Sequence, residues 1–330
     1  MHHDLIVIGS GSGNSLLTPE LAGLDVAIVE AGTFGGTCLN VGCIPTKMFV
    51  LPAERATEAA DAARLGVHFA SPRVDWPAIR DRIFGRIDPI SAGGERYRRE
   101  DPAVTVYAAR ARFVGDRRLA LSTGEQISAD RIVVAAGGRA VGLDVEGLRE
   151  PDPARGVHTS DTVMRMEGLP RRMVVVGGGF VACEFAHIFS ALGVDVVQVQ
   201  RSGSLLRAEE TEIQEVVTRV ASARHTVHLG ATVRSATYAG DAWALEIATP
   251  AGVVTERAEA VLLAVGRQPN TDLLDPAAGG LACHDDGRLV VDAQLRTTAP
   301  EVGALGDVSS AHQLKHVANH EARIVAHNLA

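Results

Sequence analysis

Two short apolar runs each lead directly into a glycine-rich turn, and this arrangement constrains the fold more than any other feature. The first run is Asp4–Ile8 before Gly9–Asn14, and the second is Met173–Val176 before Gly177–Ala182. The pattern predicts a buried strand, a tight turn and the start of a helix, in which backbone N–H groups can approach a pyrophosphate. Two such units predict an α/β protein with two Rossmann-like, three-layer dinucleotide-binding domains.

The first turn is followed by a second predicted strand, Val26–Val29, which ends in an acid at Glu30. An acid about twenty residues after such a turn is typical of one that accepts a hydrogen bond from an adenosine ribose hydroxyl. The glycine pattern alone is weak because Asn14 replaces the third glycine. The flanking strand and the acid strengthen it, and the candidate ligand-binding residues are Gly9, Gly11, Ser12, Gly13, Asn14 and Glu30.

The second turn differs from the first in the residues that follow its next strand. That strand, Val194–Val199, ends in Gln200 and Arg201, and Arg207 follows. An acid at position 200 would bind a free ribose hydroxyl and repel a phosphate, whereas Gln200 beside two arginines favours a 2′-phosphate. The sequence therefore predicts NADPH, bound by Gly177, Gly179, Phe180, Val181, Ala182, Arg201, Arg207 and a later turn at Gly266. The alternative is a pair of solvated arginines in an arginine-rich chain.

Two cysteines, Cys38 and Cys43, lie five positions apart in an apolar, glycine-punctuated segment. On a regular helix their side chains would point about 140° apart, so a disulfide between them needs the distorted turn that Gly42 and Pro45 permit. Zinc sites prefer shorter spacings and a second ligand pair, and the remaining cysteines lie far away in the sequence. The spacing therefore favours redox chemistry.

The segment Gly35–Lys47, GGTCLNVGCIPTK, resembles the active-site signature of the flavin- and pyridine-nucleotide-dependent disulfide reductases, the family of glutathione reductase and dihydrolipoamide dehydrogenase. The resemblance covers the whole chain. Its flanking runs at 33–35 and 48–50, with 313–322, resemble the branch whose substrate is mycothione, the disulfide of mycothiol. The resemblance implies FAD as the first dinucleotide, a redox-active Cys38–Cys43 disulfide and mycothione as the small-molecule partner.

The resemblance also implies roles for individual residues. Cys38 would attack the substrate, and Cys43 would lie against the flavin as a thiolate favoured by Lys47. Glu184 would pair with Lys47 beside the flavin, a solvent-facing Glu184 being the alternative. The run Val302–Asp307 resembles a second FAD motif, in which Asp307 accepts from a ribitol hydroxyl. Further FAD contacts are implied at Gly36, Thr37, Lys47 and Gly137.

The implied domain plan is an FAD domain at 1–150 and 268–330 with an NADPH domain at 151–267. Family members carry a further C-terminal domain that forms the homodimer and supplies an acid/base histidine. We expect this chain to lack that domain, so that alone it turns over substrate poorly and its dimer is doubtful. Three alternatives stay open: a dihydrolipoamide dehydrogenase, which would use NAD; a mercuric reductase, whose extra C-terminal cysteines are missing; and a non-catalytic FAD-binding remnant.

The overall charge and the apolar pattern exclude other classes of function. A net charge of −8 and a pI near 5.8 argue against nucleic-acid binding, and no apolar run approaches the roughly 18 residues of a membrane span. Because the first strand is expected near Asp4, with His2 and His3 as leader residues, a signal peptide has no room and we expect a cytoplasmic protein.

Three further patterns complete the reading. Helices are expected at Ala53–Leu65, Trp76–Tyr97 and about Leu314–Leu329. Only two of the 32 basic Lys and Arg residues are lysine, Lys47 and Lys315, which suggests positions where a guanidinium would not serve. His312, His316 and His320 recur every four residues, but no carboxylate or cysteine cluster accompanies them and we expect no metal site.

Overall fold

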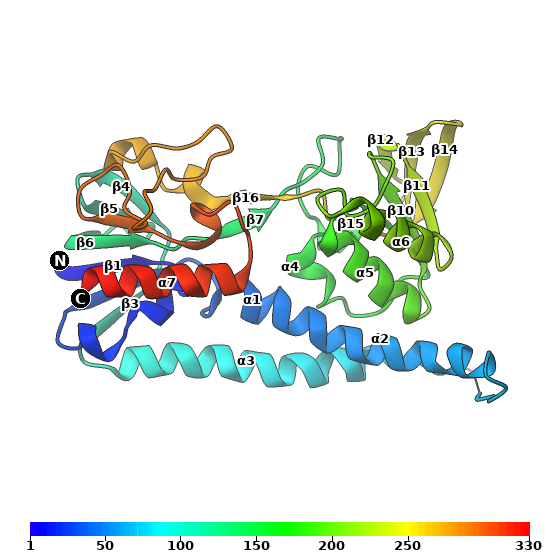
Figure 1. Ribbon diagram of the computed structural model, residues 1–330, viewed down its shortest axis with the longest axis horizontal. Coiled ribbons are helices and arrows are strands. Elements are labelled where there is room, and N and C mark those ends of the chain that lie inside the picture. The colour runs from blue at the N-terminus through cyan, green and yellow to red at the C-terminus, as the bar shows by residue number, and fades with distance from the viewer. Residues whose placement is uncertain (71) are drawn as a thin grey trace. The chain divides into compact units, whose positions relative to one another are not determined.

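A computed structural model describes residues 1–70 and 72–330 (Figure 1). The chain divides into two compact units, each an α/β arrangement as the sequence predicts. Unit 1 comprises Met1–Cys43, Arg86–Arg139 and Gln268–Ala330, and unit 2 comprises Ile44–Gly85 and Ala140–Arg267. The segment Ile44–Gly85 thus packs with the second unit, although the sequence expectation assigned it to the first.

Unit 1 is built on a seven-stranded sheet within residues 1–43, 86–139 and 268–330. Its order is β3-β2-β1-β6-β5-β4, and β17 pairs with β6. The pairs among β3, β2, β1, β6 and β17 are parallel, whereas β5 and β4 add antiparallel strands. The bounds are β1 His2–Ile8, β2 Val26–Glu30, β3 Val104–Ala108, β4 Ala111–Gly115, β5 Arg118–Leu121, β6 Gln126–Val134 and β17 Val302–Ala304.

Alternate residues of β1 supply the two faces of this sheet. Leu5 and Val7 are fully buried on the face covered by helix α7, Lys315–Leu329, which contributes Ala322 (Figure 1). Ile6 and Ile8 lie in the cluster on the other face, with Phe113. Because both faces are covered, the stretch Leu5–Ile8 of this strand is apolar throughout, as parallel strands usually are. The apolar run seen in the sequence is therefore a central strand.

Two expectations for the start of the chain are wrong. No α-helix follows the first glycine turn within residues 13–25; the chain forms the short 3₁₀ helices η1 Gly13–Leu16 and η2 Pro19–Leu21 instead, because Pro19 and Gly23 interrupt the segment. His2 and His3 are not leader residues, since both belong to β1. The buried His3 ring contacts Asp25 and the Tyr107 hydroxyl, each at 3.1 Å.

In the described part of unit 2, a five-stranded parallel sheet of order β11-β10-β9-β15-β8 packs against a three-stranded antiparallel sheet, β12-β13-β14. Val174, Val197 and Val261 of the larger sheet share one core with Leu245 and Ile247 of the smaller. The bounds are β8 Val157–His158, β9 Arg172–Val176, β10 Asp195–Gln200, β11 Thr226–Leu229, β12 Thr232–Tyr238, β13 Trp243–Thr249, β14 Gly252–Ala258 and β15 Ala260–Leu263.

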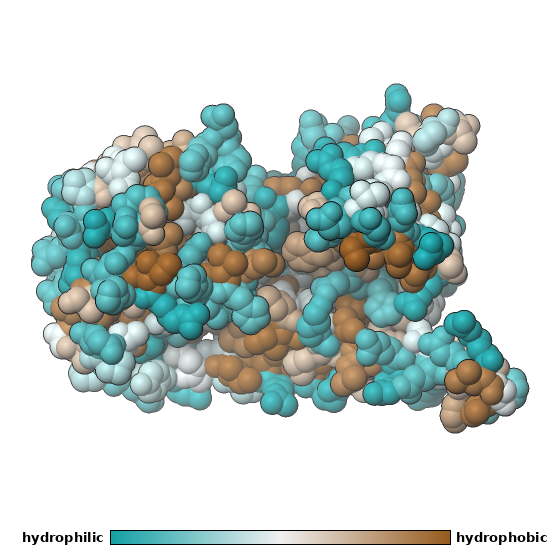
Figure 2. Space-filling view, viewed as in Figure 1, coloured by the Kyte–Doolittle hydropathy of each residue, from teal (hydrophilic) through white to brown (hydrophobic). Residues whose placement is uncertain are grey.

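The segment Ile44–Gly85 belongs to unit 2 because its aromatic side chains pack there. The ring of Trp76 lies 5.1 Å from that of Phe49 and 5.9 Å from that of Phe189, and the Trp76 indole N–H donates to the carbonyl of Met166. Spacing in the sequence cannot reveal the contact with Phe189, because that residue lies more than a hundred positions from Trp76. Figure 2 shows apolar atoms exposed where this segment leaves α2, at Leu65, Val67 and Phe69.

Helices α2 and α3 are longer than the sequence pattern indicated, whereas α7 has nearly the predicted bounds. Helices α2 and α3 each contain an internal proline, Pro52 and Pro89, without ending there. No helix of the described residues is long and apolar enough to cross a membrane. The remaining bounds are α1 Gly36–Asn40, α2 Cys43–Ala63, α3 Trp76–Glu100, α4 Ser160–Val163, α5 Phe180–Ala191, α6 Thr211–Ser222, β7 Gly138–Ala140, β16 Arg267–Pro269, η3 Pro153–Arg155, η4 Asn270–Leu273, η5 Pro276–Gly279 and η6 Gly306–Val308.

Three histidines make unit 2 sensitive to acid. Burial lowers the pKa of His158, His187 and His225 below the ordinary value. The unfolded chain takes up these protons near pH 6.5 while the folded chain resists, so stability is complete above that pH and falls as the pH drops through it. We expect the Tm to decrease between about pH 7.5 and about pH 5.5, above the range where carboxylates titrate. His225→Asn should flatten this slope, whereas the same change at exposed His68 should not; equal slopes would contradict the assignment.

Candidate functional site

The first glycine turn is fixed by contacts on both sides. Gly9 has φ +104° and its N–H donates to the carbonyl of Val29 at 2.8 Å. A Cβ at Gly9 would lie 2.3 Å from the carbonyl oxygen of Ala135, and one at Gly13 would lie 2.8 Å from side chains of Ala135 and Val7. Only glycine fits at these two positions without a shift of the turn.

Glu30 joins this turn to the segment that precedes the cysteines. One carboxylate oxygen accepts from the Ser10 N–H at 2.8 Å and the Ser10 hydroxyl at 2.6 Å, and the other accepts from the Gly32 N–H at 2.8 Å. The Ser10 hydroxyl in turn accepts from the Gly35 N–H at 2.9 Å. Because a carboxylate has about four acceptor positions, the half-buried Glu30 can still accept a ribose hydroxyl.

The second glycine pair lies against the first turn, backbone to backbone. A Cβ at Gly36, which has φ +71°, would lie 2.6 Å from the Cα of Gly11. The buried amide of Asn40 holds this pair by donating to the carbonyls of Phe34 at 2.9 Å and Gly36 at 3.1 Å. Bare backbone, bounded by an acid, fits the pyrophosphate and ribose of a dinucleotide such as FAD.

Side chains that sequence reasoning did not assign also hold the first turn. The Lys315 ammonium donates to the Ser12 hydroxyl at 3.0 Å, and that hydroxyl donates to the amide oxygen of Asn319 at 3.0 Å. The Arg98 guanidinium donates to the Asn14 side chain at 2.7 Å. The scarcity of lysine pointed to Lys315, whereas nothing in the sequence singled out Arg98 among thirty arginines.

The two cysteines belong to different helices rather than to one distorted turn. Cys38 lies in α1, and Cys43 is the first residue of α2. The break between them falls at Gly42, where a Cβ would lie 2.9 Å from the carbonyl oxygen of Thr37. Both thiols are free, Cys38 half-buried and Cys43 exposed.

The thiol groups share a proton unequally. A hydrogen bond from Cys38 is the main cause that lowers the pKa of Cys43 to about 6, and the nearby charges of Lys315 and His316 lower it further. The same hydrogen bond, with burial, raises the pKa of Cys38 far above its ordinary value. At neutral pH the pair therefore consists of a Cys43 thiolate and a protonated Cys38.

Lys47, near the start of α2, is paired with an acid. Its ammonium forms an ion pair with the carboxylate of Glu184, which projects from the first turns of α5, although the Glu184 side chain is still 33% exposed. Both residues belong to unit 2. In unit 1, the cations at the start of α7, Lys315 and His316, are among the causes that lower the pKa of Cys43.

The second glycine turn, in unit 2, repeats the geometry of the first. Gly177 has φ +136°, its N–H donates to the carbonyl of Val199 at 2.9 Å, and a Cβ would lie 2.2 Å from the carbonyl oxygen of Ala264. Helix α5 follows, with Ala182 fully buried, Val181 half-buried and Phe180 exposed. Ala182 replaces the third glycine without a clash because it faces the core.

The segment after β10 folds back onto this turn. The Leu206 N–H donates to the carbonyl of Gly178 at 2.7 Å. Gln200 lies beneath Gly178 with its amide engaged locally, donating to the Ser204 carbonyl at 3.2 Å and accepting from the Arg201 N–H at 3.0 Å. The guanidinium groups of Arg201 and Arg207 are exposed, and neither has a hydrogen-bonded or ionic partner among the described residues.

The remaining predicted residues lie at glycine turns or beside them. Gly137 has φ +65° and its carbonyl accepts from the Asn270 N–H at 3.0 Å. Asp307 lies in η6, directly after β17, with its Cβ near Gly138. In unit 2, Gly266 has φ +146° and its carbonyl accepts from the Val141 N–H. Thr37 is exposed on α1.

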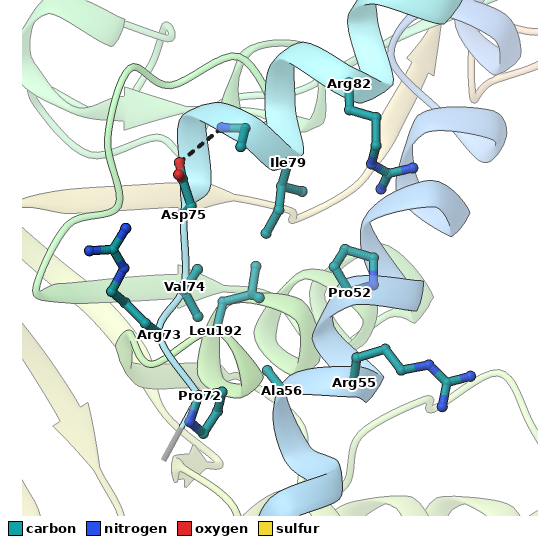
Figure 3. Close-up of a pocket in the computed structure, with 11 residues that line it drawn as sticks. Pro52, Arg55, Ala56, Pro72, Arg73, Val74, Asp75, Ile79, Arg82 and Leu192 are labelled. Atoms are coloured by element: carbon teal, nitrogen blue, oxygen red, sulfur yellow. Dashed lines mark hydrogen bonds between the residues drawn. The ribbon is translucent and has the colours of Figure 1, made fainter. Parts of the chain in front are cut away.

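Neither a metal site nor the cavity seen in unit 2 involves these residues. No three His, Cys, Asp or Glu side chains gather as a metal ion requires within residues 1–70 and 72–330. A cavity of about 390 Å³ lies between α2, α3 and the end of α5, lined by Pro52, Ile79 and Leu192 (Figure 3). Figure 3 shows the Arg55 side chain pointing away from its centre.

Comparisons with known proteins agree with this geometry. Residues 3–322 match the family model described as pyridine nucleotide-disulphide oxidoreductase. Mycothione reductase of Mycobacterium tuberculosis is 48% identical over 99% of this chain and 71% of its own length, and dihydrolipoyl dehydrogenase of Halobacterium salinarum is 35% identical over 99% and 70%. The HOCl-induced flavoprotein disulfide reductase RclA from Escherichia coli, solved as a Cu(II) complex, superposes with a TM-score of 0.87 at 26% identity, covering 100% of this chain and 71% of that one.

Proposed function

Because this chain belongs to the pyridine nucleotide-disulphide oxidoreductase family, we propose that it is an NADPH-dependent flavoprotein that reduces mycothione to mycothiol. The observation that carries the proposal is the polarised pair Cys38 and Cys43, in which one sulfur is a thiolate and the other holds the proton. The name of the 48% identical relative supports the choice of substrate.

We assign FAD to unit 1 and NADPH to unit 2. The turn from Gly9 to Asn14, with Glu30, Gly36 and Thr37, would hold the pyrophosphate and adenosine of FAD, and Gly137 and Asp307 would hold its ribitol side. Bound FAD supplies a two-electron carrier between the nicotinamide hydride and the disulfide. Lys47 and Glu184 form an ion pair in unit 2, and we propose that this pair lies beside the bound flavin.

The cysteines can then carry out thiol-disulfide exchange. Two electrons open the Cys38–Cys43 disulfide to a thiol and a thiolate. The Cys38 sulfur attacks one sulfur of mycothione, its proton passes along the existing hydrogen bond to Cys43, and one mycothiol thiolate leaves. Cys43, once deprotonated, attacks the Cys38 sulfur of the mixed disulfide, so that the second mycothiol leaves and the protein disulfide forms again.

A single-turnover experiment tests this function. Anaerobic NADPH should make both cysteines of the FAD-loaded protein reactive toward iodoacetamide, as measured by mass spectrometry. Mycothione added before the label should protect both and release two mycothiols per protein. Protection by lipoamide but not by mycothione would favour a dihydrolipoyl dehydrogenase, and unreactive cysteines after NADPH would defeat the proposal.

Preference for NADPH over NADH should depend on Arg201 and Arg207. A charge-assisted hydrogen bond to phosphate contributes roughly 1.5 to 3 kcal/mol, about tenfold to a hundredfold in affinity. Changing both arginines to alanine should therefore narrow the ratio of NADPH to NADH affinity by at least about tenfold, measured by flavin-reduction kinetics. Arg234→Ala, at an exposed position on β12, is the control. An unchanged ratio in the double variant would contradict the assignment.

A further inference from the structure

A glutamine side chain is fully buried in the middle of β10, among valines. Gln198 is 0% exposed, and its neighbours in the strand, Val197 and Val199, are buried with it. A buried amide costs free energy unless its donors and acceptor are hydrogen-bonded. An apolar residue would be expected at this position. The hydrogen bonds of the amide indicate why a glutamine is present instead.

Both ends of the Gln198 amide are engaged. Its nitrogen donates to the carbonyl oxygen of Gly177 at 3.0 Å, and its oxygen accepts from Nε2 of His225 at 3.0 Å. Nδ1 of His225 is buried and has no partner among the described residues. The His225 ring therefore carries its proton on Nε2, where it fixes the orientation of the amide.

This bond determines which way the first peptide of the second turn faces. In a trans peptide the C=O and N–H groups point in opposite directions. With the Gly177 carbonyl held toward Gln198, the Gly178 N–H points away from the core. The carbonyl of Gly178 accepts from the Leu206 N–H, so the Gly179 N–H points away from Leu206. Neither of these N–H groups donates a hydrogen bond within the described part of the chain.

A turn of three glycines has little intrinsic preference for this conformation, because glycine adopts positive and negative φ almost equally. We propose that Gln198 is a positioning residue for pyridine-nucleotide binding, which holds the Gly177 carbonyl inward so that the free N–H groups face the pyrophosphate. His225 holds the amide in place. This inference rests on the proposed function, since it deepens the assignment of the nucleotide to unit 2.

The test compares Gln198→Leu with Val196→Ala, a change at a buried position on the same strand that does not contact the turn. NADP⁺ binding is measured by calorimetry on the FAD-loaded protein, together with Tm and flavin content. We expect the Kd of NADP⁺ to rise about tenfold in Gln198→Leu and less than about twofold in Val196→Ala, with flavin content unchanged in both.

Gln198→Glu gives a readout that a purely structural role does not predict. A protonated carboxyl can donate to the Gly177 carbonyl, whereas an ionised one repels it. NADP⁺ affinity of this variant should therefore improve relative to the unaltered protein as the pH falls. If Gln198→Leu does not fold, the His225→Leu variant tests the inference instead. Its Kd for NADP⁺ should be about threefold higher than that of the unaltered protein.

Equal Kd values in Gln198→Leu and Val196→Ala would overturn the inference and leave the proposed function standing. So would a Gln198→Glu variant whose relative affinity does not change with pH. Failure of the unaltered protein to bind NADP⁺ or NADPH would instead overturn the proposed function, and the inference with it.

Discussion

Replacing Gly9 with alanine should leave the protein unable to retain FAD, whereas the same change at Gly23 should leave the flavin content unchanged. Both glycines have similar positive φ angles, +104° and +99°. At either site, holding an alanine in that left-handed conformation costs about 1 to 2 kcal/mol. At Gly9 the new Cβ would also lie 2.3 Å from the Ala135 carbonyl oxygen, while at Gly23 nothing lies within 4 Å.

The overlap at Gly9 can be relieved only by moving the turn away from the end of β6. Such a displacement costs a large share of the 5 to 15 kcal/mol that stabilises a typical domain. Flavin content per protein, from the visible absorbance after gel filtration, and Tm measure the effect. Gly177→Ala and Gly252→Ala form a second matched pair, with φ of +136° and +130°, for NADP⁺ binding. A Gly9→Ala protein with full flavin content would show that the turn is not the FAD site.

Replacing Cys38 with alanine should raise the pKa of Cys43 from about 6 by roughly two units, toward that of a free cysteine. The hydrogen bond from Cys38 is the largest cause of the low value, and alanine removes it. The measurement is the pH midpoint of iodoacetamide labelling of Cys43 in the reduced protein, followed by mass spectrometry. The midpoint is the right quantity, because the rate at one pH also reflects the intrinsic nucleophilicity of the thiolate.

Two lysine variants act as graded controls for this titration. Lys315→Met should raise the midpoint by less than Cys38→Ala, since Lys315 is a smaller cause. Lys47→Met should leave it unchanged, because the Lys47 charge is paired with Glu184. A midpoint that responds to Lys47 and not to Lys315 would contradict this prediction and support the role that the family resemblance implies for Lys47.

The strands and both glycine turns could be predicted from the sequence because their causes are local. An apolar run followed by glycines specifies a buried strand and a turn whatever the rest of the chain does, and Glu30, Gly9 and Gly177 were found in this way. The ion pair of Lys47 with Glu184 was expected from resemblance alone. The predicted helix after Gly13 was wrong because the glycine pattern was given more weight than the nearby Pro19.

Other features depend on contacts between distant residues, and no local pattern contains them. Trp76 and Phe189 bring Ile44–Gly85 into unit 2 across more than a hundred residues. The sequence analysis used Gln200 only as a position without an acid. In the structure its side chain lies beneath Gly178 and donates a hydrogen bond to the Ser204 carbonyl. Gln198, two residues earlier, carries the amide bonded to the turn, and its polarity inside an apolar strand was the available signal.

The pairing of β17 with β6 has a consequence for the order in which the protein is made. Residues 302–304 lie beside residues 132–134, so the sheet of unit 1 is completed only after residue 304 has left the ribosome. Until then the Gly9 turn has its Ala135 neighbour but neither Asp307 nor Lys315. Unit 2, whose residues all precede position 268, can reach its native packing first. We therefore expect the flavin to be captured only after residue 315 has emerged, with unit 2 already folded on the nascent chain.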